Sequence, residues 1–140
     1  MLHMMKLSVG SDSIESMAEW QRAQSGQRVD GRYYHLTRMW PKRGDEILAQ
    51  GGSIYWVIQG VMLARQRIER FEPMEGADGI RRCAIFLDPE IVRVAATPRR
   101  PFQGWRYLDG ADAPPDLRGD TGGDDLPPAL RAALAEIGVR

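Results

Sequence analysis

The sequence predicts an α+β protein, built as a small, mostly antiparallel, partly open β-barrel with two to three peripheral helices. Short runs of β-branched and aromatic residues recur through residues 1–108, and tight-turn residues separate most of these runs. The sequence lacks the regular alternation of strands and helices that defines a doubly wound sheet. Strands joined by tight turns pair in antiparallel fashion, and a curved sheet of such strands can enclose one core.

Size and composition indicate a single globular domain, and we expect it to be cytoplasmic. A chain of 140 residues with 43% hydrophobic and 27% charged residues can bury one core. No apolar run approaches the roughly 20 residues that a membrane-spanning helix needs, and the N-terminal run is too short for a signal peptide. The single cysteine, Cys83, excludes an intramolecular disulfide framework and a multi-cysteine zinc site.

The N-terminal part is predicted to form a strand and then a helix. Residues 2–9 alternate in polarity as a half-buried strand does. Asp12 and Glu15 have the spacing of a capping box, so a helix is expected over about residues 13–24. The polar, turn-rich residues 25–31 predict a loop.

A second strand and a short helix are expected next. Residues 33–39 are β-branched and aromatic, which favours a strand. Pro41 suits the first turn of a helix over residues 41–49. Gly51 and Gly52 would end that helix, because glycine readily adopts the left-handed conformation found after helix ends.

The middle of the chain predicts a series of hairpins. Residues 53–58 are apolar and aromatic, and the Gln59-Gly60 pair after them fits a two-residue hairpin turn or a bulge. Residues 61–71 fit both helical and strand spacing. A strand is the simpler choice, because a turn at residues 75–79 and a strand-like run at residues 80–87 follow.

The last third of the chain changes in composition. Strand-like runs at residues 91–96 and 99–108 would complete a β-barrel-like domain over residues 1–108. The acidic, Gly/Pro-rich residues 109–125 have few apolar side chains and predict a surface excursion. A final helix, packed on the domain, is expected within residues 126–140.

Few residues suggest catalysis. His35 could act with Thr37 or Asp45, but no sequence motif joins it to a nucleophile. Cys83 lies in an apolar run, where a free cysteine is commonly a small hydrophobic residue. The sequence shows neither the ligand spacing of a metal site nor a phosphate-binding glycine loop. We therefore assign no catalytic residue, metal or cofactor.

Two segments, residues 37–43 and 99–108, combine basic with aromatic residues, and we expect them to meet across a groove. Aromatic faces stack bases while guanidinium groups hold phosphates, so this combination suits RNA or modified DNA. The predicted ligand-binding residues are Arg38, Trp40, Lys42, Arg43, Tyr55, Arg65, Arg99, Arg100, Gln103, Trp105 and Arg106.

Three functions are compatible with these residues. The first is a non-catalytic module that binds nucleic acid or a nucleotide in the groove. The second is a hydrolytic enzyme for a nucleotide or other small molecule, centred on His35. The third is a structural or interaction protein without a ligand, in which the arginines only brace the fold. Trp105 distinguishes the binding module from the structural protein, because its side chain either forms the floor of a groove or anchors the core.

The sequence carries no signal for an oligomeric state.

Five longer motifs stand out, at residues 1–10, 37–43, 51–60, 64–68 and 99–108. Together they resemble a bacterial family, mainly alphaproteobacterial, that is catalogued as domain of unknown function 1489. The resemblance covers about residues 1–114 and implies no activity, because the family has none assigned.

A short helix, a Gly-Gly step into an aromatic strand and a long hairpin are similar in arrangement to the PUA-like superfamily. This second resemblance implies a small barrel that binds RNA, or modified bases in DNA, in a groove beside the barrel.

Overall fold

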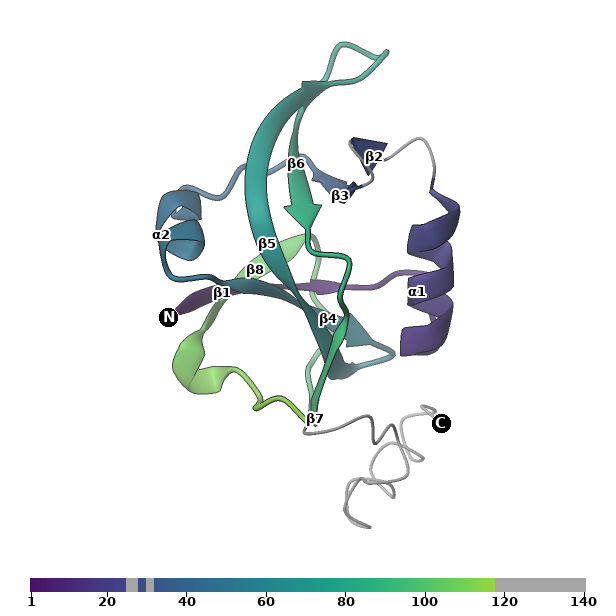
Figure 1. The fold of residues 1–140 in the computed structure, drawn as a ribbon, viewed down its shortest axis with the longest axis vertical. Coiled ribbons are helices and arrows are strands. Elements are labelled where there is room, and N and C mark those ends of the chain that lie inside the picture. Colours follow the sequence, from purple (N-terminus) through teal and green to yellow (C-terminus); the bar gives the residue numbers. More distant parts are fainter. Residues whose placement is uncertain (25–27, 30–31, 118–140) are drawn as a thin grey trace.

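The computed structural model describes residues 1–24, 28–29 and 32–117. These residues form a strongly curved β-sheet with two α-helices beside it (Figure 1). The strands are β1 (Leu2–Leu7), β2 (Arg28–Val29), β3 (Arg32–Thr37), β4 (Ser53–Ile58), β5 (Val61–Glu75), β6 (Arg81–Leu87), β7 (Val92–Pro98) and β8 (Trp105–Asp109). The helices are α1 (Ile14–Ala23) and α2 (Gly44–Ala49), with a 3-10 turn at Gly110–Asp112. The helix expected within residues 126–140 lies outside the described residues.

The sheet has the strand order β2-β3-β6-β5-β4-β1-β8, with β7 paired to β5. Strands β1 and β4 run parallel, and the other pairs are antiparallel. The edge strands β2 and β8 do not pair with each other, so the sheet is not closed. The predicted α+β class and the mostly antiparallel, open arrangement are therefore confirmed.

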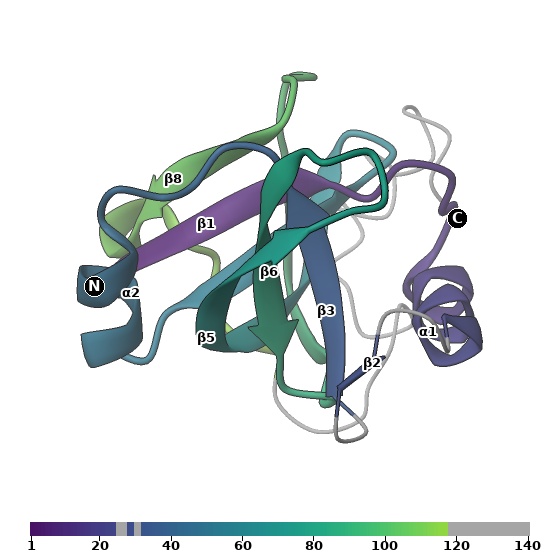
Figure 2. The same ribbon diagram turned by 90° about the horizontal axis from the view of Figure 1, so that it is seen from above.

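Strand β5 gives the sheet its curvature. Its first residues pair with β4 and β7, while the residues from Ile68 onward pair with β6, and a register irregularity lies between Ile68 and Arg70. A bulge of this kind bends a strand and increases its twist. The sheet consequently wraps round until β3 lies across from β1 (Figure 2), and Met4, Tyr33 and Trp56 share one core.

The turn between β4 and β5 follows the sequence prediction. Gln59 and Gly60 have φ angles of 48° and 84°, the left-handed values that a two-residue hairpin turn of this type needs at both positions. Ile58 and Val61 pair directly across it. The strand chosen for residues 61–71 is confirmed, and it extends to Glu75.

Helix α1 is capped differently from the prediction. Ser13 is the N-cap: its side chain accepts a hydrogen bond from the Ser16 backbone at 3.0 Å, and Ser16 Oγ accepts from the Ser13 backbone at 3.2 Å. Asp12 and Glu15 were predicted for these roles. The cap lies one residue later than predicted, so Ser16 occupies the third helical position, and Glu15, at the second, forms an ion pair with Arg93 on β7.

Helix α2 begins at Gly44, three residues later than predicted, because Pro41 first forms a turn in which its carbonyl accepts from Gly44 N at 3.1 Å. Its end agrees with the prediction. Gly51, with φ of 71°, donates to Leu48 O, and Gly52 donates to Ile47 O at 2.8 Å. A Cβ on Gly52 would lie 2.3 Å from Leu2 O, so only glycine allows β1 to approach here.

The segment after β8 contacts the sheet in its described part. Pro114 is buried, and Ala113 and Leu117 pack against apolar clusters beneath β7 and β8. Asp116 forms a bridge to Val94 on β7. The first residues of the predicted acidic excursion, as far as Leu117, therefore lie along the domain.

Candidate ligand pocket

The two segments predicted to meet do so, and they are in direct contact. Trp105 Nε1 donates to the Met39 carbonyl at 2.8 Å, and the Arg43 backbone N donates to the Tyr107 hydroxyl at 3.0 Å. Trp105 is 8% exposed and meets the Tyr107 ring edge to face, with centroids 4.8 Å apart. Trp105 thus belongs to the core, where it ties β8 to the loop after β3.

Arg38 and Trp40 lie on the surface at the far end of β3, where they line an open depression. Trp40 is 45% exposed and packs on Phe71, with ring centroids 6.4 Å apart. The remaining lining residues are Pro73, Arg81, Arg82 and Cys83. Among the described residues, neither Arg38 nor Arg81 forms an ion pair. We call this feature the basic depression.

The predicted residues of the loop before α2 lie outside that depression. Lys42 and Arg43 are both exposed. Arg43 forms a bidentate ion pair with Glu46, at 3.0 and 2.7 Å, and its guanidinium lies 5.6 Å from the centre of the Tyr107 ring. Arg43 is therefore engaged within the protein.

The predicted residues before and within β8 are spread over the surface. Arg100, Gln103 and Arg106 are exposed, and Arg106 lies 6.0 Å from the centre of the Phe102 ring. Arg99 Nε is buried and makes no hydrogen bond within the part of the chain that the structure describes. These residues do not line the basic depression.

Tyr55 and Arg65 lie on the opposite face of the sheet, in what we call the far-face cluster: His3, Ser53, Tyr55, Arg65 and Asp116. The Ser53 backbone N donates to His3 Nδ1 at 2.9 Å, and Arg65 Nη1 donates to Ser53 Oγ at 2.9 Å. Arg65 also forms a bidentate pair with Asp116, with both distances 2.7 Å. The cluster lines a wide, open hollow next to Met1.

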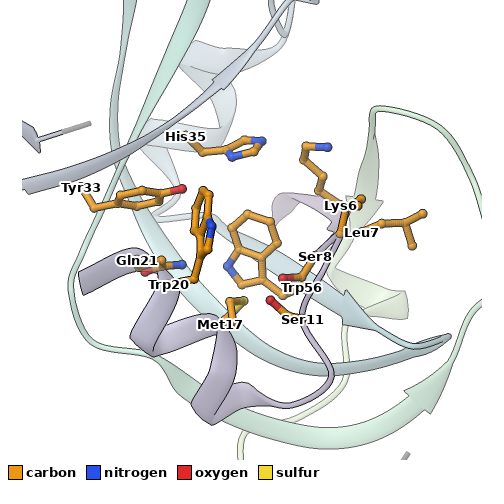
Figure 3. Close-up of a pocket in the computed structure, with 11 residues that line it drawn as sticks. Lys6, Leu7, Ser8, Ser11, Met17, Trp20, Gln21, Tyr33, His35 and Trp56 are labelled. Carbon is orange, nitrogen blue, oxygen red and sulfur yellow. The ribbon is translucent and has the colours of Figure 1, made fainter. Parts of the chain in front are cut away.

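A different hollow has the strongest features of a ligand site. It lies where β1 ends, between helix α1 and strands β3 and β4, and Figure 3 shows its walls. We call it the aromatic pocket, and its volume is about 110 Å³. It is lined by Lys6, Leu7, Ser8, Val9, Ser11, Met17, Trp20, Gln21, Tyr33, His35 and Trp56.

An amide network fixes one wall of the aromatic pocket. Trp56 Nε1 donates to Gln66 Oε1 at 2.9 Å, and Gln66 is completely buried on β5. Gln21 of α1 and Gln66 exchange two hydrogen bonds, at 2.8 and 3.0 Å, and Gln66 Nε2 also donates to the Asp88 carbonyl. Buried amides that are satisfied in this way hold α1 and the Trp56 ring in one position.

His35 supplies a polar group to this apolar space. Its ring meets Trp56 edge to face, with centroids 5.6 Å apart and an interplanar angle of 87°. Its Nε2 is buried and has no hydrogen-bond partner among the residues that the structure describes. Burial, aided by the positive charge of Lys6, lowers the pKa of His35 to about 4, so the imidazole is neutral at pH 7.

Trp20 and Lys6 complete the pocket at its edges. Trp20 is 49% exposed and contacts Tyr33 edge to face, with centroids 6.0 Å apart. Lys6 is half-buried, and burial lowers its pKa below the usual lysine range. In Figure 3 the ammonium group lies on the same side of the pocket as the His35 ring. The pocket thus presents aromatic faces, one neutral imidazole and one cation.

Among the described residues, the lining of the pocket contains no carboxylate, and neither Thr37 nor Asp45 belongs to it. No group of three or more metal-ligating side chains is found among the described residues. Cys83 is buried, which raises the pKa of its thiol to about 12 and leaves it protonated. Within the described part of the chain, no helix has the length and apolar character that crossing a membrane requires.

Sequence reasoning missed most of this pocket. Lys6, Trp20, Tyr33 and Trp56 were not among the predicted ligand-binding residues, and His35 was considered as a catalytic residue. One signal was present: Trp20 lies at the edge of the apolar stripe of α1, where a large aromatic side chain remains half exposed.

The described residues define a small, open, curved-sheet protein with an aromatic pocket beneath one helix. The chain belongs to the family described as protein of unknown function (DUF1489), whose model matches residues 4–140. The match extends beyond the residues 1–114 on which the resemblance rested. Comparisons with curated proteins and with solved structures gave no match.

Proposed function

We propose that this protein is a non-catalytic nucleic-acid-binding module of the bacterial cytoplasm, with a PUA-like fold. Its aromatic pocket would hold one base that is turned out of an RNA or DNA strand. The observation that carries this proposal is the combination of aromatic walls with a buried polar atom of His35 that has no partner within the described residues.

The pocket has the chemistry to hold part of a planar ring. Aromatic side chains stack bases, and hydrogen-bonding groups beside them read the edge of the base. An engineered protein cavity of about 150 Å³ is enough to bind benzene. The aromatic pocket is smaller, at about 110 Å³, and it is open at the rim beside the half-exposed Trp20, so a base would be only partly enclosed and would stack in part outside the pocket.

The basic depression supports nucleic acid as the ligand. His35 and Thr37 pair with Ile85 and Cys83, so Cys83 in the depression lies on the same face of β3 and β6 as His35 in the pocket. Arg38 and Arg81, which form no ion pair with another described residue, could contact phosphates there, while Trp40 offers a face for an adjacent base.

The other two functions have less support from the described residues. An enzyme centred on His35 would need a group to orient or activate the imidazole, and the described part of the pocket lining has no carboxylate for this purpose. The buried Trp105 favours a structural role for residues 99–108, so the binding function rests on the aromatic pocket instead. Two buried polar atoms of the described residues have no hydrogen-bond partner, Arg99 Nε and His35 Nε2, and of these only His35 lines a hollow described above. A purely structural protein gives no reason for such an atom beside an open pocket, since buried polar groups are ordinarily satisfied.

Binding of short single-stranded RNA and DNA to the full chain tests the proposal. Stacking on a side chain contributes about 1–3 kcal/mol per base, so Trp20→Ala should weaken binding about tenfold. Arg38→Gln combined with Arg81→Gln should reduce the slope of log affinity against log salt by about 1.4, because about 0.7 is lost per phosphate contact.

The control is Arg67→Gln, which removes one exposed charge outside both features. It should leave the effect of Trp20→Ala unchanged. If no RNA or DNA, with or without base modifications, binds at low salt, the proposal is wrong.

A further inference from the structure

Lys6 brings a positive charge into the aromatic pocket that no described residue neutralises. Its side chain lines the pocket and is half-buried. Within the described part of the chain, none of the ion pairs includes Lys6 and none of the residues that line the pocket is acidic. The other basic side chain in the lining is that of His35, which is neutral at pH 7.

The sheet fixes where this charge lies. In register, Lys6 is paired with Trp56 on β4 and with Trp105 on β8. Because side chains alternate along a strand, Lys6 shares a face with Met4, which is part of the main core. The ammonium group therefore enters the aromatic pocket from the β1 side, and Figure 3 shows it beside the space that His35 borders.

This charge determines which ligands an aromatic pocket can accept. Pockets built from several aromatic rings commonly bind cations, because the ring faces are electron-rich. An ammonium group in the lining repels a second cation. A partly desolvated charge is also costly unless it is paired, so an anionic ligand recovers free energy that the empty pocket has lost.

We propose that the pocket binds a nucleotide, with the base against the aromatic residues and a phosphate oxygen held by Lys6 Nζ. This inference rests on the function proposed above. The phosphate could belong to a strand or to a free mononucleotide, since the chemistry at Lys6 is the same. Aromatic residues bind the base, Lys6 binds the anion, and cationic ligands are excluded.

The test uses the full chain and measures competition against a fluorescent oligonucleotide. The competitors are the four nucleosides, their 3′- and 5′-monophosphates, inorganic phosphate and tetramethylammonium. At least one monophosphate should compete about tenfold or more better than its nucleoside, the gain expected for one charge-assisted hydrogen bond. Competition by 3′- or 5′-monophosphates identifies which side of the sugar faces Lys6.

Three variants test whether Lys6 causes the higher affinity of the monophosphate over its nucleoside, which we call the phosphate gain. Lys6→Gln should abolish the phosphate gain and leave nucleoside affinity within about twofold, whereas Lys6→Arg should retain most of the gain. Arg67→Gln removes an equal charge at an exposed position and should leave the gain unchanged. Circular dichroism of each variant confirms that it is folded.

Each remaining outcome overturns the inference. Equal competition by nucleosides and nucleotides would do so, and so would a phosphate gain that persists in Lys6→Gln. Both results leave the proposed function intact, because nucleosides or the oligonucleotide still bind. Competition by inorganic phosphate without any contribution from the base would identify an adventitious ion only. Preference for tetramethylammonium, or an oligonucleotide that no mononucleotide displaces, would also contradict it.

Discussion

The aromatic pocket and the far-face cluster lie on opposite faces of the same two strands, β1 and β4, and each contains a histidine. In the far-face cluster, His3 Nδ1 accepts from Ser53, and Arg65 is bound to both Ser53 and Asp116. In the aromatic pocket, His35 Nε2 has no partner and Lys6 has no counter-ion within the described residues.

The difference shows how to separate a scaffold from a binding site when both are polar hollows. Polar groups that satisfy one another contribute stability and leave little capacity for a ligand. Polar groups left over after folding reduce stability, and proteins retain such groups where function requires them. Pairing of the hydrogen-bonding groups, more than the size of the hollow, therefore identifies the aromatic pocket.

The largest effect on the free energy of unfolding is expected from protonation of His35. The folded-state pKa of about 4 lies below the ordinary value of 6.5, so the unfolded chain binds a proton between these values and the folded chain does not. Protonation favours unfolding as pH falls through this window, with a total loss of about 3 kcal/mol. Urea unfolding of the protein and of His35→Phe from pH 7 to 4 measures this contribution. If the free energy of unfolding changes with pH equally in both proteins, His35 does not make this contribution.

A smaller effect is expected on the far face. Arg65→Met removes the pair with Asp116 and the bond to Ser53, and should lower the free energy of unfolding by about 1–2 kcal/mol, allowing for partial exposure. Oligonucleotide affinity should not change. Arg67→Met is the matched control, because its ion pairs are longer, at 3.6 and 3.7 Å. A loss of affinity in Arg65→Met would make the far face part of the binding surface.

The smallest effect should be an increase in the free energy of unfolding. Lys6→Met removes a half-buried charge and keeps a side chain of similar length, so it should raise the free energy of unfolding by about 0.5 kcal/mol. Chemical unfolding at pH 7 measures this change. A clear loss of stability would show that Lys6 serves the scaffold, and the contrast between the two faces would then disappear.

The sequence predicted the elements that local chemistry determines. The Gln59-Gly60 turn, the strand after it and the glycine end of α2 depend on neighbouring residues, and all three are confirmed. The capping of α1 was predicted wrongly because Ser13, not Asp12, is the N-cap, which places Ser16 at the third helical position; Glu15 forms an ion pair with Arg93, 78 residues away. Asp12 with Glu15 and Ser13 with Ser16 have the same spacing, so the pattern alone does not choose between the two caps.

The aromatic pocket was not predictable in the same way. Its residues come from β1, α1, β3 and β4, and they meet only because β5 bends the sheet. The predicted contact between residues 37–43 and 99–108 does form, through Trp105 and Met39. Whether this contact forms a groove or part of the core depends on how deeply Trp105 is buried, and Trp105 proved to be a core residue.

The pairing of β1 also has a consequence for how the molecule assembles. Strands β4, β5 and β6 are consecutive hairpins, whose contacts close short loops and can form early. Strand β1 must find β4 about fifty residues away in parallel, and β8 must return across about one hundred residues to join it. We therefore expect the hairpins to act as the folding nucleus. The pocket, which needs β1 in place, would be completed in the last steps of folding.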